Sequence, residues 1–460
     1  MEYQLSEDKF CENYIDSAGK FRHKVGSKIK LFPFITTPGT EPIMSLERLA
    51  GRIISIIEGA QMDHISANDV ITELISKTNI QVGQEDVFRR LLTNVFFDKE
   101  GKIKPLNLKL LEVAIDLEAT EKKHAEYIAS VLGNKAVLKD AIEKAHAECM
   151  KNSNVLENMV VSCVAKDTHV LECDDYFCVS TGLIGKFNED FQFVLENATR
   201  TKEHLVQLLE FYYFMYTVQS AMNLDRFFAG DRSEIIPLYF SLDWEQTSLS
   251  RKCYSEGWQK VQSSLNRIFA HVVTLDFLNL TDDGFPQVDY IMLRELVDGD
   301  PEVEKKMAIE VRHITDMYRA NINDCSEMKG LERDETKQDR LDAEVRFLFN
   351  SVKTQFEFVR NRPYTAYSRK FVAYCNKYLK NRRRSGMMLT LTEDMVLFLT
   401  KICIKEKDRI RLKEVFDEFA ARGVFLDDTS KDKVTEYYEK LNLIEKKSDS
   451  GDAKYVKRIL

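Results

Sequence analysis

The strongest chemical signal in the sequence is a concentration of positive charge around residue 370. No acidic residue lies between Glu357 and Glu393, although the whole chain carries a net charge of -8. Such a row of cations can neutralise phosphates and release counterions, giving salt-sensitive affinity for nucleic acid that does not depend on base sequence. The candidate DNA-binding residues in this segment are Arg369, Lys370, Lys377, Lys380, Arg382, Arg383 and Arg384.

The same charges also have a structural interpretation. Phe371, Tyr374 and Tyr378 fall on one face of a predicted helix, which leaves the neighbouring lysines for the solvent side. The three consecutive arginines would then lie near the end of this helix, where its dipole favours cations, and Gly386 could cap it. An acidic partner protein could bind the same surface, so a role in DNA binding is one of several possibilities.

The C-terminal segment 391–460 is predicted to form three helices and then a hairpin. Thr392 and Thr429 can cap the first and third helices, and the second ends near Gly423. This order indicates a winged-helix domain, in which the third helix enters a major groove and the wing touches the DNA backbone. The candidate contacts are Lys431 and Lys433 on the third helix and Lys446 and Lys447 on the wing.

Acidic side chains oppose this interpretation. Asp427, Asp428, Asp432, Glu436 and Glu439 flank the third helix, where a surface that faces phosphates would carry few acids. Because a fold does not determine a function, the module could equally dock on another protein.

Signatures of catalysis are absent from the sequence. It contains no phosphate-binding loop, no nucleophile elbow and no zinc-protease motif, and its eight histidines are never three to five residues apart. We therefore expect no catalytic residue, no cofactor and no metal site. One alternative is a metal-dependent nuclease that is active only in a complex, for which the nearest cluster of carboxylates with a lysine is Asp167, Glu172, Asp174, Asp175 and Lys186.

Composition favours a globular protein in the cytoplasm. The nine cysteines include no CxxC pair, which indicates reduced thiols. The segment Met1–Asp16 lacks the layout of a signal peptide. The most apolar run, Leu205–Met222, is interrupted by Glu210 and Gln219, so it predicts a buried helix rather than a membrane span.

Apolar periodicity predicts a mostly α-helical fold, with a multi-helical body, a small β-hairpin and the C-terminal winged helix. The hairpin is expected between Thr168–Cys173 and Tyr176–Thr181. The expected divisions are an extended lead-in (1–42), a helical domain (43–164), a second, mostly helical domain with short strands (165–320), a polar loop or linker (321–340), helices with the basic segment (341–390) and the winged helix (391–460).

Three short stretches carry a family resemblance. They are Lys28–Phe34 (KIKLFPF), Pro237–Glu245 (PLYFSLDWE) and Gly451–Leu460 (GDAKYVKRIL), near the start, the middle and the end of the chain. They resemble the DptG, or DndG, family of DNA phosphorothioation-dependent restriction proteins. The resemblance implies a subunit of a bacterial defence complex that acts with two larger partners, DptF and DptH, which look like the ATP-using components.

The resemblance and the charges together predict a non-catalytic subunit that bridges partner proteins and contacts double-stranded DNA. A motor supplied by a partner would be consistent with the missing phosphate-binding loop. The alternatives are the cryptic nuclease and an adaptor that binds only proteins. The resemblance adds no site residues.

Overall fold

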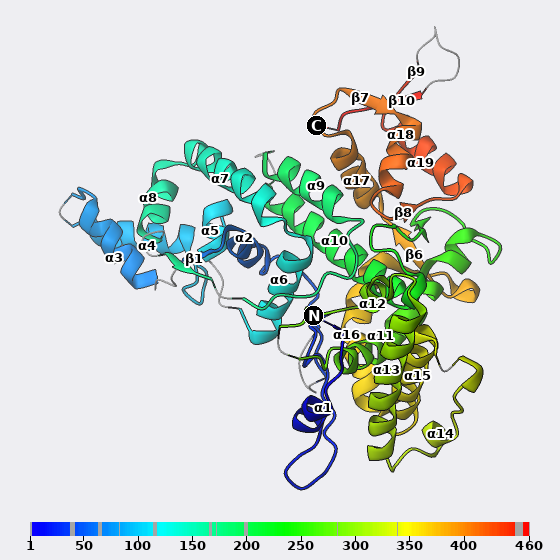
Figure 1. The fold of residues 1–460 in the computed structure, drawn as a ribbon. Helices are drawn as coiled ribbons and strands as arrows, with labels where there is room; N and C mark the ends of the chain where they lie inside the picture. Colours follow the sequence, from blue (N-terminus) through cyan, green and yellow to red (C-terminus); the bar gives the residue numbers. More distant parts are fainter. Residues whose placement is uncertain are drawn as a thin grey trace.

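A computed structural model describes most of the chain. The described residues are 2–36, 42–62, 67–81, 83–113, 117–164, 168–171, 173–196, 201–282, 284–337, 339–446 and 454–459. The prediction of a mostly helical protein is confirmed (Figure 1). No helix in the described part of the chain is both long and apolar enough to cross a membrane.

The N-terminal lead-in contains a short helix, α1 (Glu7–Tyr14), which the sequence prediction missed. The Ser6 side chain accepts a hydrogen bond from the Lys9 amide, and Phe10 and Tyr14 bury one face of the helix. The following extended stretch is held by Asp276, whose carboxylate accepts the amides of Lys28 and Ile29 at 2.8 and 3.2 Å. The lead-in is thus part of the packed interior.

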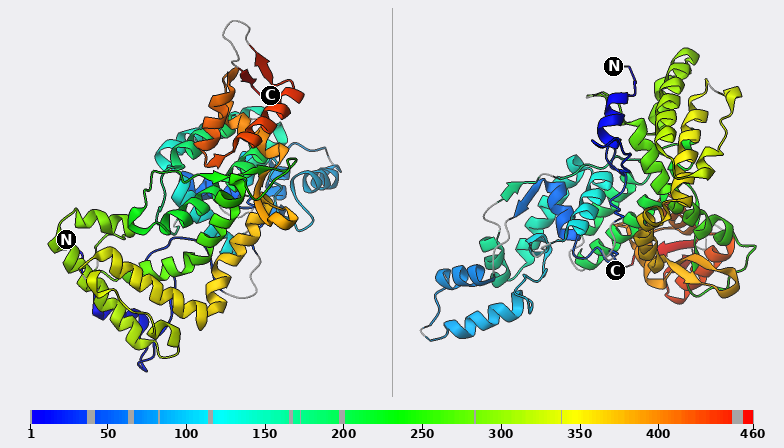
Figure 2. Two further views of the ribbon diagram at one scale, coloured as in Figure 1. Left: turned by 90° about the vertical axis from the view of Figure 1, so that its right-hand side faces the viewer. Right: turned by 90° about the horizontal axis from the view of Figure 1, so that it is seen from below.

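Eight helices form the first part of the body. They are α2 (Ala50–Glu58), α3 (Ala67–Lys77), α4 (Glu85–Phe96), α5 (Leu108–Val113), α6 (Ala119–Leu132), α7 (Lys135–Asn152), α8 (Val155–Val164) and α9 (Ile184–Glu196). Figure 2 shows α3 and α4 projecting from the rest of the molecule. These two helices share a separate hydrophobic cluster with α5 and α8.

The main core is built around two long helices, α10 (Thr201–Leu224) and α11 (Gln259–Leu278). The apolar character of α10 on nearly every side predicts burial, and every residue from Phe211 to Leu224 is buried. Around them lie α12 (Tyr290–Val297), α13 (Pro301–Asn321), α14 (Ser326–Lys329), α15 (Leu341–Phe358) and α16 (Asn361–Cys375). A single hydrophobic cluster runs from Tyr3 to Val456, so the first and last segments share one core.

The described residues do not form the hairpin predicted around Asp174. Instead β2 (Thr168–Val170) pairs antiparallel with β1 (Ala60–Met62), and the described part of Tyr176–Thr181 has no strand. Local β-branched residues therefore indicated one strand correctly, but the partner lies more than a hundred residues away.

The C-terminal unit, defined as residues 391–446 and 454–459, contains three helices and a three-stranded antiparallel sheet. The helices are α17 (Glu393–Ile404), α18 (Leu412–Ala420) and α19 (Asp428–Lys440). The strands are β7 (Arg409–Arg411), β9 (Ile444–Lys446) and β10 (Lys454–Lys457), in the order β7-β10-β9. Thr392 caps α17 as predicted, whereas α19 is capped by Asp427 and not by Thr429.

Two small sheets join this unit to the body. β3 (Leu238–Tyr239) pairs in parallel with β8 (Val424–Phe425), and β4 (Ser241–Leu242) pairs in parallel with β6 (Met387–Leu391). β5 (Leu379–Asn381) completes the second sheet against β6. The basic segment thus turns from α16 into a β-hairpin, so Arg382–Arg384 lie in its turn and not at a helix end.

Candidate nucleic-acid interface

Most of the cations predicted to bind DNA in the basic segment contact the protein itself. Lys377 forms an ion pair with Glu210 at 2.8 Å, and Lys380 pairs with Asp243. The Arg382 guanidinium donates to the backbone carbonyls of Leu242 at 2.5 Å and of Glu245 at 3.0 Å. Lys377 thus ties the end of α16 to α10, whereas Lys380 and Arg382 hold the β5–β6 hairpin against the segment around β4, so all three have a structural role.

Two arginines of the predicted set remain available to a ligand. Arg369 and Arg383 are exposed, and neither forms an ion pair with any described residue. Lys370 is half-buried and has an interaction within the chain. The Arg384 side chain lies outside the described residues.

The lysines predicted on α19 also have acidic neighbours. Lys433 pairs with Glu436 at 2.8 Å, and Lys431 lies 3.7 Å from Asp428. Of the lysines predicted on a wing, Lys446 of β9 lies 3.9 Å from Glu439, which Lys454 also contacts, and Lys447 is outside the described residues. The acids that the sequence places around α19 therefore offset its positive charge locally, and this helix presents a nearly balanced surface.

A different basic surface lies on the three-stranded sheet. Ile410 and Val456 point into the core and lie opposite each other in register. Because side chains alternate along a strand, their neighbours Arg409, Arg411, Tyr455 and Lys457 all point to the other side. We call these four residues the sheet face.

The sheet face combines cations with an aromatic ring. Arg411 lies directly opposite Tyr455 and Lys457 opposite Arg409. The Arg409 guanidinium is 5.4 Å from the centre of the Tyr455 ring, and Arg409 also pairs with Glu445. Arg411 and Lys457 are exposed, and neither forms an ion pair with any described residue. The sequence analysis missed this surface, although the alternation Arg409-Ile410-Arg411 could have indicated it.

One buried and one half-buried arginine attach the C-terminal unit to the body on its other side. The Arg422 guanidinium makes two hydrogen bonds to Asp190 of α9, at 2.6 and 2.7 Å, and both side chains are 0% exposed. The Tyr212 hydroxyl of α10 donates to the same carboxylate at 2.7 Å. Arg251 binds Asp427, the cap of α19, at 2.5 and 2.6 Å. These forked, charge-assisted hydrogen bonds fix the orientation of the sheet face relative to the body.

The residues considered for a nuclease do not converge in the described structure. Asp174 pairs with Lys30 at 2.5 Å, whereas Lys186 pairs with Glu418 at 3.1 Å and Glu189 at 3.3 Å. Asp167 and Glu172 lie outside the described residues. No lysine of the predicted set therefore stands beside the described carboxylates.

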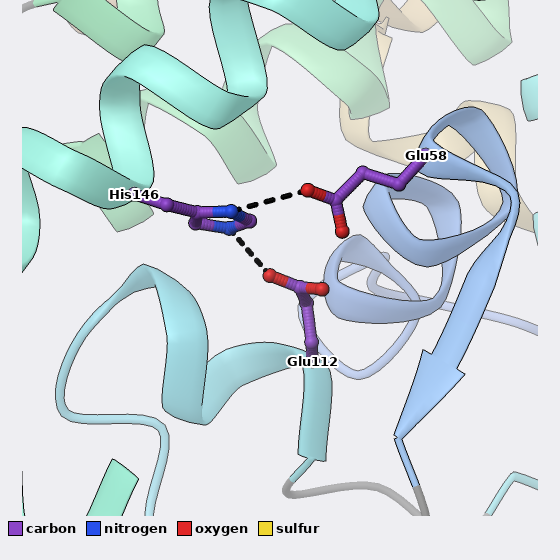
Figure 3. A group of neighbouring side chains, drawn as sticks. All are labelled: Glu58, Glu112 and His146. Carbon is purple, nitrogen blue, oxygen red and sulfur yellow. Dashed lines mark ion pairs between the residues drawn. The ribbon is translucent and has the colours of Figure 1, made fainter. Parts of the chain in front are cut away.

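A different group of potential metal ligands is brought together by α2, α5 and α7. Figure 3 shows the His146 ring lying between Glu58 and Glu112. Its Nδ1 is 3.1 Å from Glu58 Oε1, and its Nε2 is 2.6 Å from Glu112 Oε1. Within the described ranges this is the one group of three such side chains whose ligand atoms all lie within 4.8 Å of one another. The sequence analysis missed it because the residues are far apart in the chain.

No family model matches the chain, and no curated protein matches it either.

Proposed function

We propose that this chain is a non-catalytic subunit of a bacterial phosphorothioation-dependent restriction complex, in which it bridges partner proteins and contacts double-stranded DNA. The proposal of DptF-like and DptH-like partners comes from the resemblance of the three sequence stretches. The proposal of a DNA contact has separate support from the distribution of charge on the structure.

We further propose that the C-terminal unit is a winged-helix module whose DNA contact is the sheet face. Support comes from the order of its elements and from the exposed cations Arg411 and Lys457, neither of which forms an ion pair with a described residue. The predicted lysines of α19 have such neighbours. Cations without partners give up no internal ion pair when they bind phosphates, whereas paired lysines must first break theirs. The single observation that carries this assignment is the placement of unpaired cations beside Tyr455.

The test is a fluorescence-anisotropy titration of labelled duplex DNA with the full chain. We expect the double variant Arg411→Glu/Lys457→Glu to weaken binding by about tenfold or more, since it removes two phosphate contacts. Lys122→Glu/Lys139→Glu is the matched control, because it changes net charge equally at two exposed lysines of α6 and α7. Equal losses in both variants would show that only total charge matters and would contradict the assignment.

A third variant separates the two basic surfaces. Arg369→Glu/Arg383→Glu reverses the cations of the basic segment that have no ion pair. If only this variant loses affinity for DNA, the DNA contact lies on the basic segment, and the assignment to the sheet face is wrong.

A protein-binding adaptor is the second candidate function, and the internal pairing of Lys377, Lys380 and Lys433 favours it. The same titration distinguishes the two. If the unmodified chain does not bind duplex DNA at low salt, DNA contact belongs to another subunit and the adaptor function stands.

A further inference from the structure

The environment of His146 requires a positive charge. A neutral imidazole has one N–H group, yet each ring nitrogen of His146 faces a carboxylate. Without a cation, one nitrogen lone pair would therefore point at a carboxylate oxygen. A proton on the ring can supply the charge, as can the ammonium of Lys109, 3.3 Å from Nδ1, or a metal ion that uses one ring nitrogen as a ligand.

The contact between His146 and Glu112 has the short distance of a strong hydrogen bond but not its alignment. Nε2 and Oε1 are 2.6 Å apart, and both atoms are buried without a properly oriented hydrogen-bond partner. The Glu112 side chain is 1% exposed, so water does not satisfy this oxygen from the surface. Two buried ligand atoms that converge without a well-aligned hydrogen bond can share a cation between them.

Several negative groups add to the potential at this point. Glu58 is the last residue of α2, where the partial negative charge of the helix C-terminus adds to the carboxylate. The Glu112 carboxylate supplies a second full charge. The Lys109 ammonium lies 3.3 Å from His146 Nδ1, 3.6 Å from Glu112 Oε1 and 3.9 Å from Glu58 Oε2. Lys109 thus lies at the centre of the group, at the edge of ion-pairing distance from both acids.

We propose that Glu58, Glu112 and His146 form a binding site for a divalent transition-metal ion of the zinc class, which joins α2, α5 and α7. One imidazole nitrogen and two carboxylate oxygens are ligands that zinc accepts, with water completing the tetrahedron. Bonds to zinc are about 2.0–2.2 Å long, so side-chain shifts of roughly 1 Å bring the three atoms to bonding distance. The Lys109 side chain is 20% exposed and can turn outward as the ion enters.

Metal and proton compete for His146. The ring must release its proton before a nitrogen can bind the ion. Binding to a protonated ring therefore displaces a proton into the buffer.

The experiment is isothermal titration of the chelator-treated full chain with zinc chloride in buffers of different ionisation enthalpy. We expect one ion to bind with release of protons, and we expect binding to be lost in His146→Gln and Glu112→Gln. Lys109→Met removes the competing ammonium and should tighten binding by about tenfold. His313→Gln is the control, since this surface histidine pairs with Glu7 away from the cluster.

Cobalt substitution separates this site from adventitious binding to the nine cysteines. Thiolate ligands give cobalt an intense near-ultraviolet band that imidazole and carboxylate ligands do not give. The proposal is overturned if the unmodified chain binds no zinc, if His146→Gln binds as tightly, or if the cobalt spectrum shows thiolate ligands. If the glutamine variants do not fold, anomalous diffraction at the zinc edge from crystals of the unmodified chain shows whether zinc lies between Glu58, Glu112 and His146. Its absence there overturns the proposal.

Discussion

Arginines have opposite roles on the two sides of the C-terminal unit. On the side that faces the body, Arg422 is 0% exposed and fully engaged by Asp190. On the outer side lies β7, at one end of the molecule in Figure 1, and its residue Arg411 is exposed and forms no ion pair with any described residue. Residue type alone does not distinguish them, whereas burial and partners do. Positive charge in this protein serves assembly where it is paired and becomes available to ligands where it is not.

The largest effect that separates the two roles is expected from Arg422→Met. This change leaves Asp190 buried without its forked partner, which typically costs about 3–5 kcal/mol of unfolding free energy. Arg411→Met is the control on the sheet face, where an exposed substitution should change the free energy by less than about 0.5 kcal/mol. Urea denaturation followed by circular dichroism measures both. Equal stabilities of the two variants would show that the buried pair does not hold the unit.

A smaller difference is expected within the basic segment itself. Arg382→Met removes the guanidinium that satisfies the carbonyls of Leu242 and Glu245, at a cost of about 1–3 kcal/mol. Its neighbour Arg383 donates no side-chain hydrogen bond to a described residue, so Arg383→Met should be nearly neutral. Thermal unfolding of the pair checks this contrast. If Arg383→Met lowers the stability and Arg382→Met does not, Arg383 and not Arg382 has the structural role.

The helices were predictable because their signals are local. Apolar residues three and four positions apart define α15, and a long run that is apolar on nearly every side defines α10. The Thr392 side chain caps α17 in the way its position before an acidic first turn indicates. Short strands were harder to predict. β3 and β4 are each two residues long, and their partners β8 and β6 lie about 150 residues or more away. Nothing in two residues encodes such a partner.

The clustering of charge along the chain was predictable from the sequence, but which of these charges stay exposed on the surface was not. The absence of acids between Glu357 and Glu393 is a feature of the sequence, yet Glu210 and Asp243 come from distant segments to pair with Lys377 and Lys380. The group around His146 shows the same limit, since its three members come from three separate helices. Spacing rules detect ligands on one helix and miss ligands that only tertiary packing assembles.

The salt dependence of DNA binding tests whether the exposed cations of the sheet face contact phosphates. Each phosphate contact contributes about 0.9 to the slope of log affinity against log salt concentration. Arg411→Met/Lys457→Met should therefore reduce the magnitude of the slope by about 2, provided that both residues contact phosphates. Anisotropy titrations at several salt concentrations give the slope. Weaker binding with an unchanged slope would indicate that the sheet face affects DNA affinity without contacting the phosphates.

The smallest effect is expected on α19. The swap Lys433→Glu/Glu436→Lys keeps the net charge of the protein and restores the ion pair with its members exchanged. If paired lysines are not DNA ligands, duplex affinity should stay within about twofold, because a change of about 0.4 kcal/mol is close to the limit of the titration. The equivalent swap on the sheet, Arg409→Glu/Glu445→Arg, also keeps the net charge but places a carboxylate beside Tyr455. It should weaken binding more than the α19 swap does, and the reverse order would assign the DNA contact to α19 as the sequence first suggested.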